Sequence, residues 1–150
     1  MTDIHSLPKI DNGSNVYYDT NLNYDIPKDV YFVFGSNIHG VHGRGAALTA
    51  RKHFGAKLGI GVGYSGMSYA IPTKATPYQT LPLLIISQYI QEFIKETQTT
   101  DKRFYLTPIG TGLAGYRVDE IAPLFKGVKN CYIPSTFRPY LEEPNSVGQC

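Results

Sequence analysis

Two glycine-rich segments and one lysine are the residues of this chain with the clearest chemical potential. The first segment runs from Gly40 to Ala46, the second from Gly110 to Tyr116, and the lysine is Lys74. Glycine lets backbone N–H groups approach an anion closely, and a helix that follows adds positive potential at its N-terminus. A lysine amine can act as a nucleophile or as an electrostatic aid. These residues predict a phosphate-type site with an amine beside it.

Each of these features follows a segment with the composition of a strand. Val30–Phe34 is a continuous apolar run, Arg103–Thr107 is rich in aromatic and β-branched residues, and Ser68–Ile71 precedes Lys74. Such segments are typical of buried strands. Open α/β sheets place ligand-contacting groups just beyond their strand ends. Lys74 is therefore a candidate for such a contact, and the alternative is a solvated surface lysine, as most lysines are.

Strands separated by helices indicate a layered α/β domain with a largely parallel sheet. Apolar residues recur at helical spacing from Leu83 to Lys95, which predicts a core helix capped by Thr80. The linker 56–66 carries four glycines and is expected to be a flexible connection. The other expected elements are helices from Ala46 to about Gly55 and over Val118–Phe125, and strands at Asn15–Tyr18 and Asn130–Ile133.

Gly110, Gly112 and Gly115 also match the G-x-G-x-x-G pattern of dinucleotide-binding domains. That pattern needs an acidic residue about 20 positions further on, which binds a ribose hydroxyl. The corresponding neighbourhood here is Ile133–Thr136, which has no acid. A second match, within residues 61–66, precedes an expected strand and does not follow one. The sequence therefore does not favour a nicotinamide-dependent oxidoreductase.

The bulk properties are those of one globular domain. The chain has 150 residues and a net charge of +2 with scattered basic residues, so no large nucleic-acid surface is indicated. Two cysteines, Cys131 and Cys150, do not form a disulfide framework, and no apolar run reaches the ~18 residues of a membrane span. The N-terminal residues do not resemble a signal peptide. We expect a cytoplasmic protein that is a monomer by default, with no cofactor and no membrane contact.

His42 of the first glycine segment and His39, just before it, have a spacing that could suggest a metal pair. A zinc site needs three or four ligands, and His53 and Cys131 stand in no supporting pattern. No metal site is therefore expected. Loop imidazoles near a diphosphate can instead donate hydrogen bonds or titrate.

Three segments in order resemble the motifs of one known family. They are Gly43–Leu48 with the downstream Lys52–Gly55, then Ile71–Lys74, then Pro108–Leu113. Over residues 30–133 the chain resembles a macrodomain, a fold that binds ADP-ribose and in some branches removes it from macromolecules. The likeness is closest to the lysine-bearing branch that includes the terminal ADP-ribose glycohydrolase and the DarG antitoxin macrodomain. It implies a three-layer α/β/α fold with a mixed central sheet at residues 29–134, between an N-terminal arm at 1–28 and a C-terminal tail at 135–150.

The resemblance also implies roles for individual residues. Lys74 would attack or stabilise the anomeric carbon of the distal ribose, Asn37 would orient this ribose, and Asp119 would be the carboxylate helper. Asp25 would contact adenine, with Asp29 as its competitor. The other ligand-binding residues implied are Gly35, Ser36, Gly40, His42, Gly43, Arg44, Gly45, Ala46, Gly110, Thr111, Gly112, Leu113, Ala114, Gly115 and Tyr116.

One departure from the family leaves the activity open. The family glycohydrolase has an acidic residue directly after its Gly-Leu pair, whereas this chain has Ala114. The leading expectation is binding of ADP-ribose, or a related NAD-derived nucleotide, with its removal from an ADP-ribosylated macromolecule. The first alternative is a binding module that reads or sequesters ADP-ribose or a cyclic derivative without catalysis. The second is a scaffold that kept the fold and lost the site.

Overall fold

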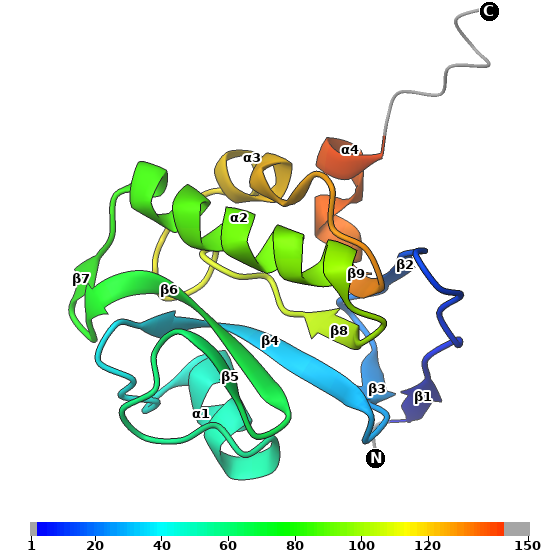
Figure 1. Ribbon diagram of the computed structural model, residues 1–150, viewed down its shortest axis with the longest axis horizontal. Helices are drawn as coiled ribbons and strands as arrows, with labels where there is room; N and C mark the ends of the chain where they lie inside the picture. Colours follow the sequence, from blue (N-terminus) through cyan, green and yellow to red (C-terminus); the bar gives the residue numbers. More distant parts are fainter. Residues whose placement is uncertain (1–2, 143–150) are drawn as a thin grey trace, which may run out of the picture.

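The computed structural model describes residues 3–142, which form a central sheet covered on both faces (Figure 1). Five strands of the sheet run parallel, and two short strands pair antiparallel with the same neighbour, β6. The order across the sheet is β2 (Val16–Tyr18), β9 (Cys131–Pro134), β8 (Arg103–Leu106), β4 (Val30–Asn37), β6 (Ser68–Thr76) and β5 (Gly63–Ser65), with β7 (Gln79–Thr80) also on β6.

The helices lie in two layers, one on each face of this sheet (Figure 1). Helix α1 (Gly45–His53) covers one face together with the N-terminal segment, which includes a separate parallel pair, β1 (Ile4–Ser6) and β3 (Asn23–Asp25). The opposite face is covered by α2 (Leu83–Thr99), α3 (Val118–Ile121), the 3₁₀ turns η1 (Ala122–Phe125) and η2 (Ser135–Phe137), and α4 (Arg138–Leu141). The predicted three-layer α/β/α fold with a mixed sheet is confirmed.

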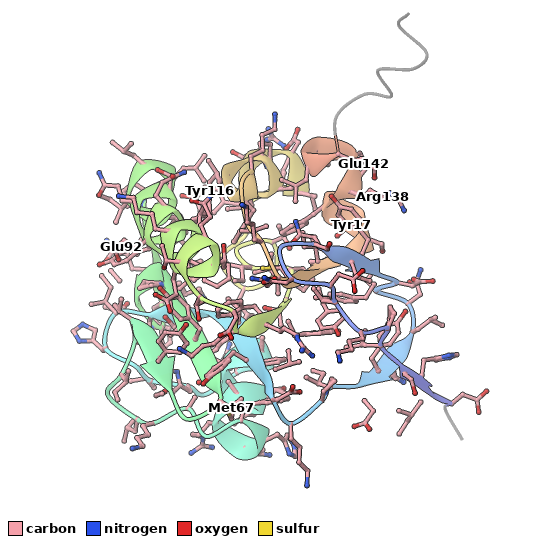
Figure 2. The ribbon with its side chains drawn as sticks, turned by 45° about the vertical axis from the view of Figure 1, so that its right-hand side comes forward. Tyr17, Met67, Glu92, Tyr116, Arg138 and Glu142 are labelled. Carbon is pink, nitrogen blue, oxygen red and sulfur yellow. The ribbon has the colours of Figure 1, made fainter. Side chains whose placement is uncertain are left out.

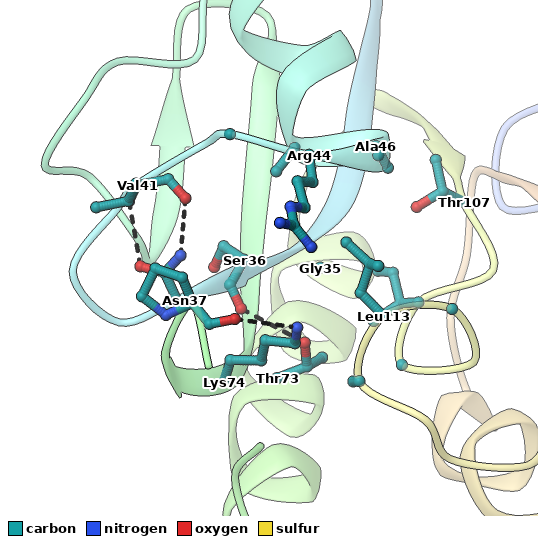
Figure 3. Close-up of a pocket in the computed structure, with 18 of the residues that line it drawn as sticks. Gly35, Ser36, Asn37, Val41, Arg44, Ala46, Thr73, Lys74, Thr107 and Leu113 are labelled. Carbon is teal, nitrogen blue, oxygen red and sulfur yellow. Dashed lines mark hydrogen bonds between the residues drawn. The ribbon is translucent and has the colours of Figure 1, made fainter. Parts of the chain in front are cut away.

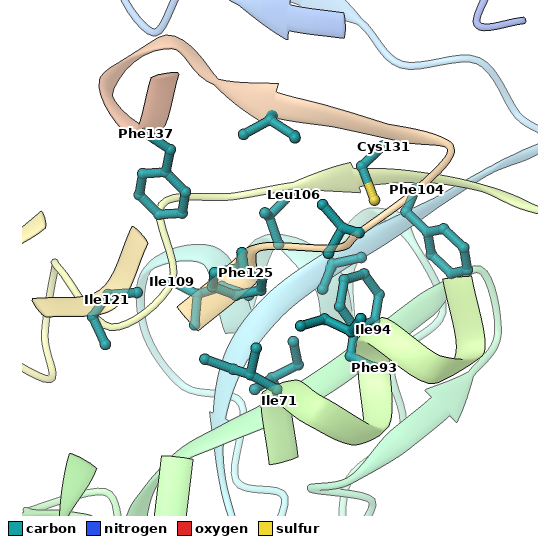
Figure 4. Packing of buried hydrophobic residues seen from close by; sticks show 14 of the residues in the cluster. Ile71, Phe93, Ile94, Phe104, Leu106, Ile109, Ile121, Phe125, Cys131 and Phe137 are labelled. Carbon is teal, nitrogen blue, oxygen red and sulfur yellow. The ribbon is translucent and has the colours of Figure 1, made fainter. Parts of the chain in front are cut away.

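Apolar side chains along β4 point alternately to the two faces of the sheet, so both faces need a covering layer. Phe32 and Phe34 pack with the alanines of α1, whereas Val33 belongs to the larger cluster with Ile90 and Phe93 of α2. Successive strand side chains point to opposite faces, so an apolar run such as β4 is stable only between two layers. Figure 4 shows the α2 side of this core, where Phe93 and Phe104 meet edge to face at 5.2 Å between ring centroids.

Both terminal segments are part of the packed domain as far as the structure describes them. β2, from the predicted arm, pairs with β9, and the Tyr18 hydroxyl donates to the Leu106 carbonyl at 2.7 Å. At the other end Phe137 is fully buried, and the Arg138 guanidinium lies 5.2 Å from the ring centroid of Tyr17 (Figure 2). The remainder of the predicted tail, residues 143–150 with Cys150, lies outside the described residues.

Two local predictions differ from the structure. The linker 56–66 contains β5, and its backbone packs against the loop that follows β4, so it is held in place over much of its length. Thr80 lies in β7 and does not cap α2, whose N-cap position is Pro82. Within residues 3–142, none of the helices combines the length and the apolar character that crossing a bilayer requires.

Candidate functional site

A cavity of about 380 Å³ opens at the carboxyl ends of β4, β6 and β8 (Figure 3). Its volume lies in the range of small-molecule sites, about 300–1,000 Å³. The parallel arrangement explains its position, because the three strands deliver their following loops to one edge of the sheet. The lining residues are Gly35, Ser36, Asn37, Val41, Gly43, Arg44, Gly45, Ala46, Ala47, Thr73, Lys74, Pro77, Tyr78, Thr107, Pro108, Ile109, Gly110, Gly112, Leu113 and Ala114.

The charged residues that line this cavity are both cations. Arg44 extends its guanidinium toward the cavity, and the Lys74 ammonium donates to the Pro77 carbonyl at 3.4 Å (Figure 3). Among the described residues neither cation has a carboxylate within salt-bridge distance. No aspartate or glutamate of residues 3–142 lines the cavity. The charge balance of the lining therefore favours an anion.

Helix α1 adds backbone donors to the same wall. Its first three residues, Gly45–Ala47, line the cavity, and its first turn has no acidic residue and no side-chain cap. The first N–H groups of a helix have no partner within the helix, and the helix dipole places partial positive charge there. A nine-residue helix that begins at a cavity beside Arg44 is thus suited to bind phosphate oxygens.

Asn37 shapes the cavity through the loop that follows it. Its Oδ1 accepts the Val41 N–H at 3.1 Å, and its Nδ2 donates to the Val41 carbonyl at 2.7 Å. The side chain is buried and its orientation is therefore fixed by the protein. One amide hydrogen and one oxygen lone pair stay free for a ligand, since a primary amide has two of each.

A β-bulge at the end of β6 sets the position of Lys74. The pairing with β4 steps from Ser36 opposite Pro72 to Asn37 opposite Lys74, which leaves Thr73 as the extra residue. The Thr73 hydroxyl donates to the Ser36 carbonyl at 3.4 Å, so the bulge is tied to β4. Bulges bend a strand and redirect side chains, and they are common beside active sites.

The glycines around the cavity have two different structural reasons. An added Cβ at Gly40 would meet the backbone of Gly59 and Ile60, and at Gly110 it would lie 2.8 Å from Ile121 Cδ1. Gly43 and Gly112 line the cavity, and an added Cβ on either would meet no atom within 4 Å. Neither has a left-handed φ. Their lack of a side chain thus opens cavity space that a ligand can fill.

The second glycine segment closes the cavity from the β8 side. Thr107 anchors it, because its hydroxyl donates to the Val33 carbonyl at 2.7 Å. Leu113 reaches toward the first segment, with its Cδ1 3.6 Å from the Cβ position of Gly45, and it remains 59% exposed. The Thr80 hydroxyl donates to the Ala114 carbonyl at 3.2 Å, which joins this segment to β7.

The structure brings most of the sequence-predicted site residues to this one cavity. Lys74 and Asn37 line it together with members of both glycine segments. The predicted residues found there are Asn37, Lys74, Gly35, Ser36, Gly43, Arg44, Gly45, Ala46, Gly110, Gly112, Leu113 and Ala114.

Three predicted residues lie elsewhere and have other partners. Asp119 accepts from Arg117 Nε at 2.9 Å in the exposed first turn of α3, and it is not among the residues that line the cavity. Asp25 lies on β3 and lines a separate hollow near His53. The Tyr116 hydroxyl donates to the Leu81 carbonyl at 2.6 Å. The carboxylate helper and the adenine contact predicted for these acids are therefore not placed at the cavity.

Four further predicted residues stabilise the loops from outside the lining. His42 is buried against Phe34, and its Nε2 donates to the Lys57 carbonyl at 3.0 Å, because a carbonyl can only accept. Gly40 makes the close backbone approach described above. The Thr111 hydroxyl donates to the Pro108 carbonyl at 2.8 Å, and the Gly115 N–H donates to the Gly112 carbonyl at 3.0 Å.

The lining includes residues that the sequence analysis did not select as ligand contacts. Pro77 and Tyr78 form the turn between β6 and β7, and this strand pairing has no strong sequence pattern. The x-Pro-Tyr sequence after a strand was the available signal, since proline favours turns. The other unselected lining residues are Val41, Ala47, Thr73, Thr107, Pro108 and Ile109.

No group of three or more His, Cys, Asp or Glu side chains within residues 3–142 is arranged to hold a metal ion. Comparisons of the chain with protein-family models, with curated proteins and with solved structures gave no match.

Proposed function

We propose that this protein binds ADP-ribose, or a closely related NAD-derived nucleotide, in the cavity at the ends of β4, β6 and β8, and releases ADP-ribose from a modified substrate. The observation that carries the binding part is the composition of the lining. Two cations and the uncapped N-terminus of α1 meet there, and no carboxylate from the described part of the chain joins them. This combination suits a diphosphate, whose negative charge is spread over several oxygens.

The two open glycines support a ligand that reaches both loops. Gly43 and Gly112 line the cavity from different segments, and neither needs to be glycine for its backbone conformation or its neighbours. A diphosphate between them would receive N–H groups from both sides. The ribose would then lie toward Asn37 and Lys74, where a fixed amide and an amine are available.

Release of ADP-ribose would begin when the Lys74 ammonium gives one proton to water at the mouth of the cavity, which frees the lone pair of its nitrogen. The nitrogen would form a bond to the anomeric carbon of the ribose, while the bond from this carbon to the substrate atom breaks and its electron pair leaves with that atom. The departing atom takes a proton from the solvent at the open mouth. Water would then displace the amine and regenerate Lys74.

Binding without catalysis is the second candidate, and a specific observation favours it. Asp119 pairs with Arg117 away from the cavity, and no carboxylate of residues 3–142 lines it, so none of these side chains is placed to be a carboxylate general base. The two functions predict the same ligand and differ only in product formation.

Both candidate functions require that the protein binds ADP-ribose. Calorimetric titration with ADP-ribose, with AMP and NAD as comparison ligands, tests this binding. Preferential binding of ADP-ribose in the micromolar range, about 8 kcal/mol of affinity, is the expected result. Absence of binding to all three nucleotides overturns it. Once binding is established, incubation with mono-ADP-ribosylated protein and with mono-ADP-ribosylated DNA separates an enzyme, which frees ADP-ribose, from a binding module.

A further inference from the structure

Exposed aliphatic side chains gather on two loops next to the cavity mouth. Of the eleven large apolar residues exposed among residues 3–142, five lie between positions 38 and 62. We name these five residues the loop face. They are Ile38, Val41, Leu58, Ile60 and Val62.

The two loops of this face are held against each other through their backbones. The Gly59 N–H donates to the Gly40 carbonyl at 3.0 Å, and the buried Ser36 hydroxyl donates to the Gly61 carbonyl. A Cβ on Gly61 would meet the carbonyl oxygens of Asn37 and Ile38. The loop face is therefore a preformed surface, and Val41 connects it to the cavity, whose lining it shares.

The sequence segment that contains both loops carries charges of one sign. The carboxylate of Glu96 reaches this segment from outside, where it accepts a hydrogen bond from the Tyr64 hydroxyl at 2.6 Å. Residues 30–91, which include both loops, contain five of the fourteen Lys and Arg residues and none of the twelve Asp and Glu residues. Lys57 begins the second loop, and Arg44 and Lys74 line the adjoining cavity. The basic residues are spread along the whole chain, as the sequence analysis stated. The acidic residues all lie within residues 1–29 and 92–150 of the sequence.

We propose that the loop face binds an apolar, acidic segment of a partner protein. Aliphatic side chains gain free energy when a partner covers them, and exposed apolar patches on soluble domains commonly mark interaction sites. The surrounding cations select a partner with carboxylates, because charge complementarity steers association and rejects like charge. The partner is defined by this chemistry and not by the nucleotide in the cavity, so the surface can be tested separately.

Three other occupants fit these observations less well. A second copy of the chain would bring the same positive face, and the two would repel. Single-stranded nucleic acid, bound without sequence preference, stacks its bases on aromatic side chains beside cations, whereas all five members of the loop face are aliphatic. A lipid surface would desolvate the irregular, glycine-rich backbone at residues 57–62, which is outside any strand, without supplying hydrogen-bond partners.

Titration of the ¹⁵N-labelled full chain, followed by amide NMR shifts, tests the surface. The probe is a short peptide that alternates leucine and glutamate. We expect shifts centred on residues 38–41 and 57–62 that weaken as salt concentration rises. Parallel titrations use a leucine–lysine peptide, a serine–glutamate peptide, a thymidine oligonucleotide and phosphatidylglycerol vesicles. Equal or stronger effects from any of these, or no shifts from the leucine–glutamate peptide, overturn the inference.

A pair of variants separates the loop face from general surface hydrophobicity. Leu58 is 74% exposed and Leu84, on α2 across the sheet, is 70% exposed, so either change to aspartate should leave folding intact. Leu58→Asp is expected to weaken binding of the leucine–glutamate peptide about tenfold, since it removes apolar contact and adds repulsion. Leu84→Asp should bind as the wild type does. Equal affinities of the two variants contradict the assignment, and concentration-dependent line broadening without peptide would assign the face to self-association instead.

Discussion

Asn37 and Val41 hold each other through two hydrogen bonds, one in each direction between a side-chain amide and the backbone. The pair closes the turn that leaves β4 and places Val41 where it lines the cavity. An amide oriented this firmly can offer its free N–H to a ligand without losing further side-chain entropy. Its ligand-binding role and its structural role are thus linked.

Replacing Asn37 with aspartate should damage this turn. The carboxylate can still accept the Val41 N–H, but its second oxygen would face the Val41 carbonyl without a hydrogen between them. We expect the free energy of unfolding to fall by about 1–3 kcal/mol, the cost of an unpaired buried polar group, and ADP-ribose affinity to fall as well. Urea denaturation and calorimetry measure both. Asn21→Asp, at an exposed turn, is the control, and wild-type stability of Asn37→Asp would contradict the two-bond role.

Gly43→Ala and Gly40→Ala should show which glycine leaves room for a ligand and which one the fold requires. At Gly43 an added methyl meets no protein atom, so we expect unchanged stability and weaker ADP-ribose binding. Gly40 has a φ of +72° and close backbone neighbours, so alanine should lower the free energy of unfolding by more than about 2 kcal/mol. Thermal unfolding and calorimetry distinguish these outcomes. Full ADP-ribose affinity in Gly43→Ala would remove this glycine from the ligand site.

The contrast between these two glycines shows where sequence analysis reaches its limit. Composition and periodicity predicted β4, β6, β8 and β9, and the family resemblance then implied that both glycine segments and Lys74 contact one ligand. Whether a glycine serves packing or ligand space depends on residues that are remote in sequence. Gly40 is fixed by the backbone of Gly59 and Ile60, and this contact has no local pattern.

The positions of Asp119 and Asp25 also depend on contacts that the sequence pattern does not reveal. Asp119 lies only a few residues beyond the second glycine segment, yet its carboxylate pairs with the Arg117 side chain, while Glu120 caps the helix at the Arg117 backbone. Asp25 precedes β4 in sequence, but it belongs to the short β1–β3 pair, which no sequence pattern predicted. Spacing along the chain placed both carboxylates near the site, and competing local partners hold them elsewhere.

Lys74→Ala should abolish release of ADP-ribose and largely preserve nucleotide binding. The amine makes one long hydrogen bond to an exposed carbonyl, so we expect the free energy of unfolding to change by no more than about 0.5 kcal/mol. Single-turnover assays on a mono-ADP-ribosylated substrate measure the release, and calorimetry with ADP-ribose measures the binding. Lys126→Ala, distant on the chain beside η1, serves as the matched lysine control. Wild-type turnover by Lys74→Ala would show that the lysine mechanism is wrong.

Arg44→Ala should weaken ADP-ribose binding about tenfold to a hundredfold. A charge-assisted hydrogen bond contributes about 1.5–3 kcal/mol, and each 1.4 kcal/mol is a factor of ten in affinity. Because the interaction is ionic, the salt dependence of binding should also become shallower. Calorimetry at two salt concentrations measures both effects. Arg51→Ala, on the exposed last turn of α1, removes the same charge away from the cavity, and an equal loss in that variant would assign the effect to net charge alone.

Tyr69 should make the domain less stable in alkali. Burial raises its pKa to about 12, and the carboxylates of Glu92 and Glu96 add to this rise, whereas the phenol of an unfolded chain titrates near pH 10. Above pH 10 the unfolded state releases this proton first, so the free energy of unfolding falls as the pH rises toward 12, and the full contribution is present below pH 10. Urea midpoints at pH 8, 10 and 11 should therefore decline, and less steeply in Tyr69→Phe. Tyr78→Phe removes a phenol that is 93% exposed and should keep the wild-type slope, so equal slopes in all three proteins would exclude Tyr69 as a source of this sensitivity.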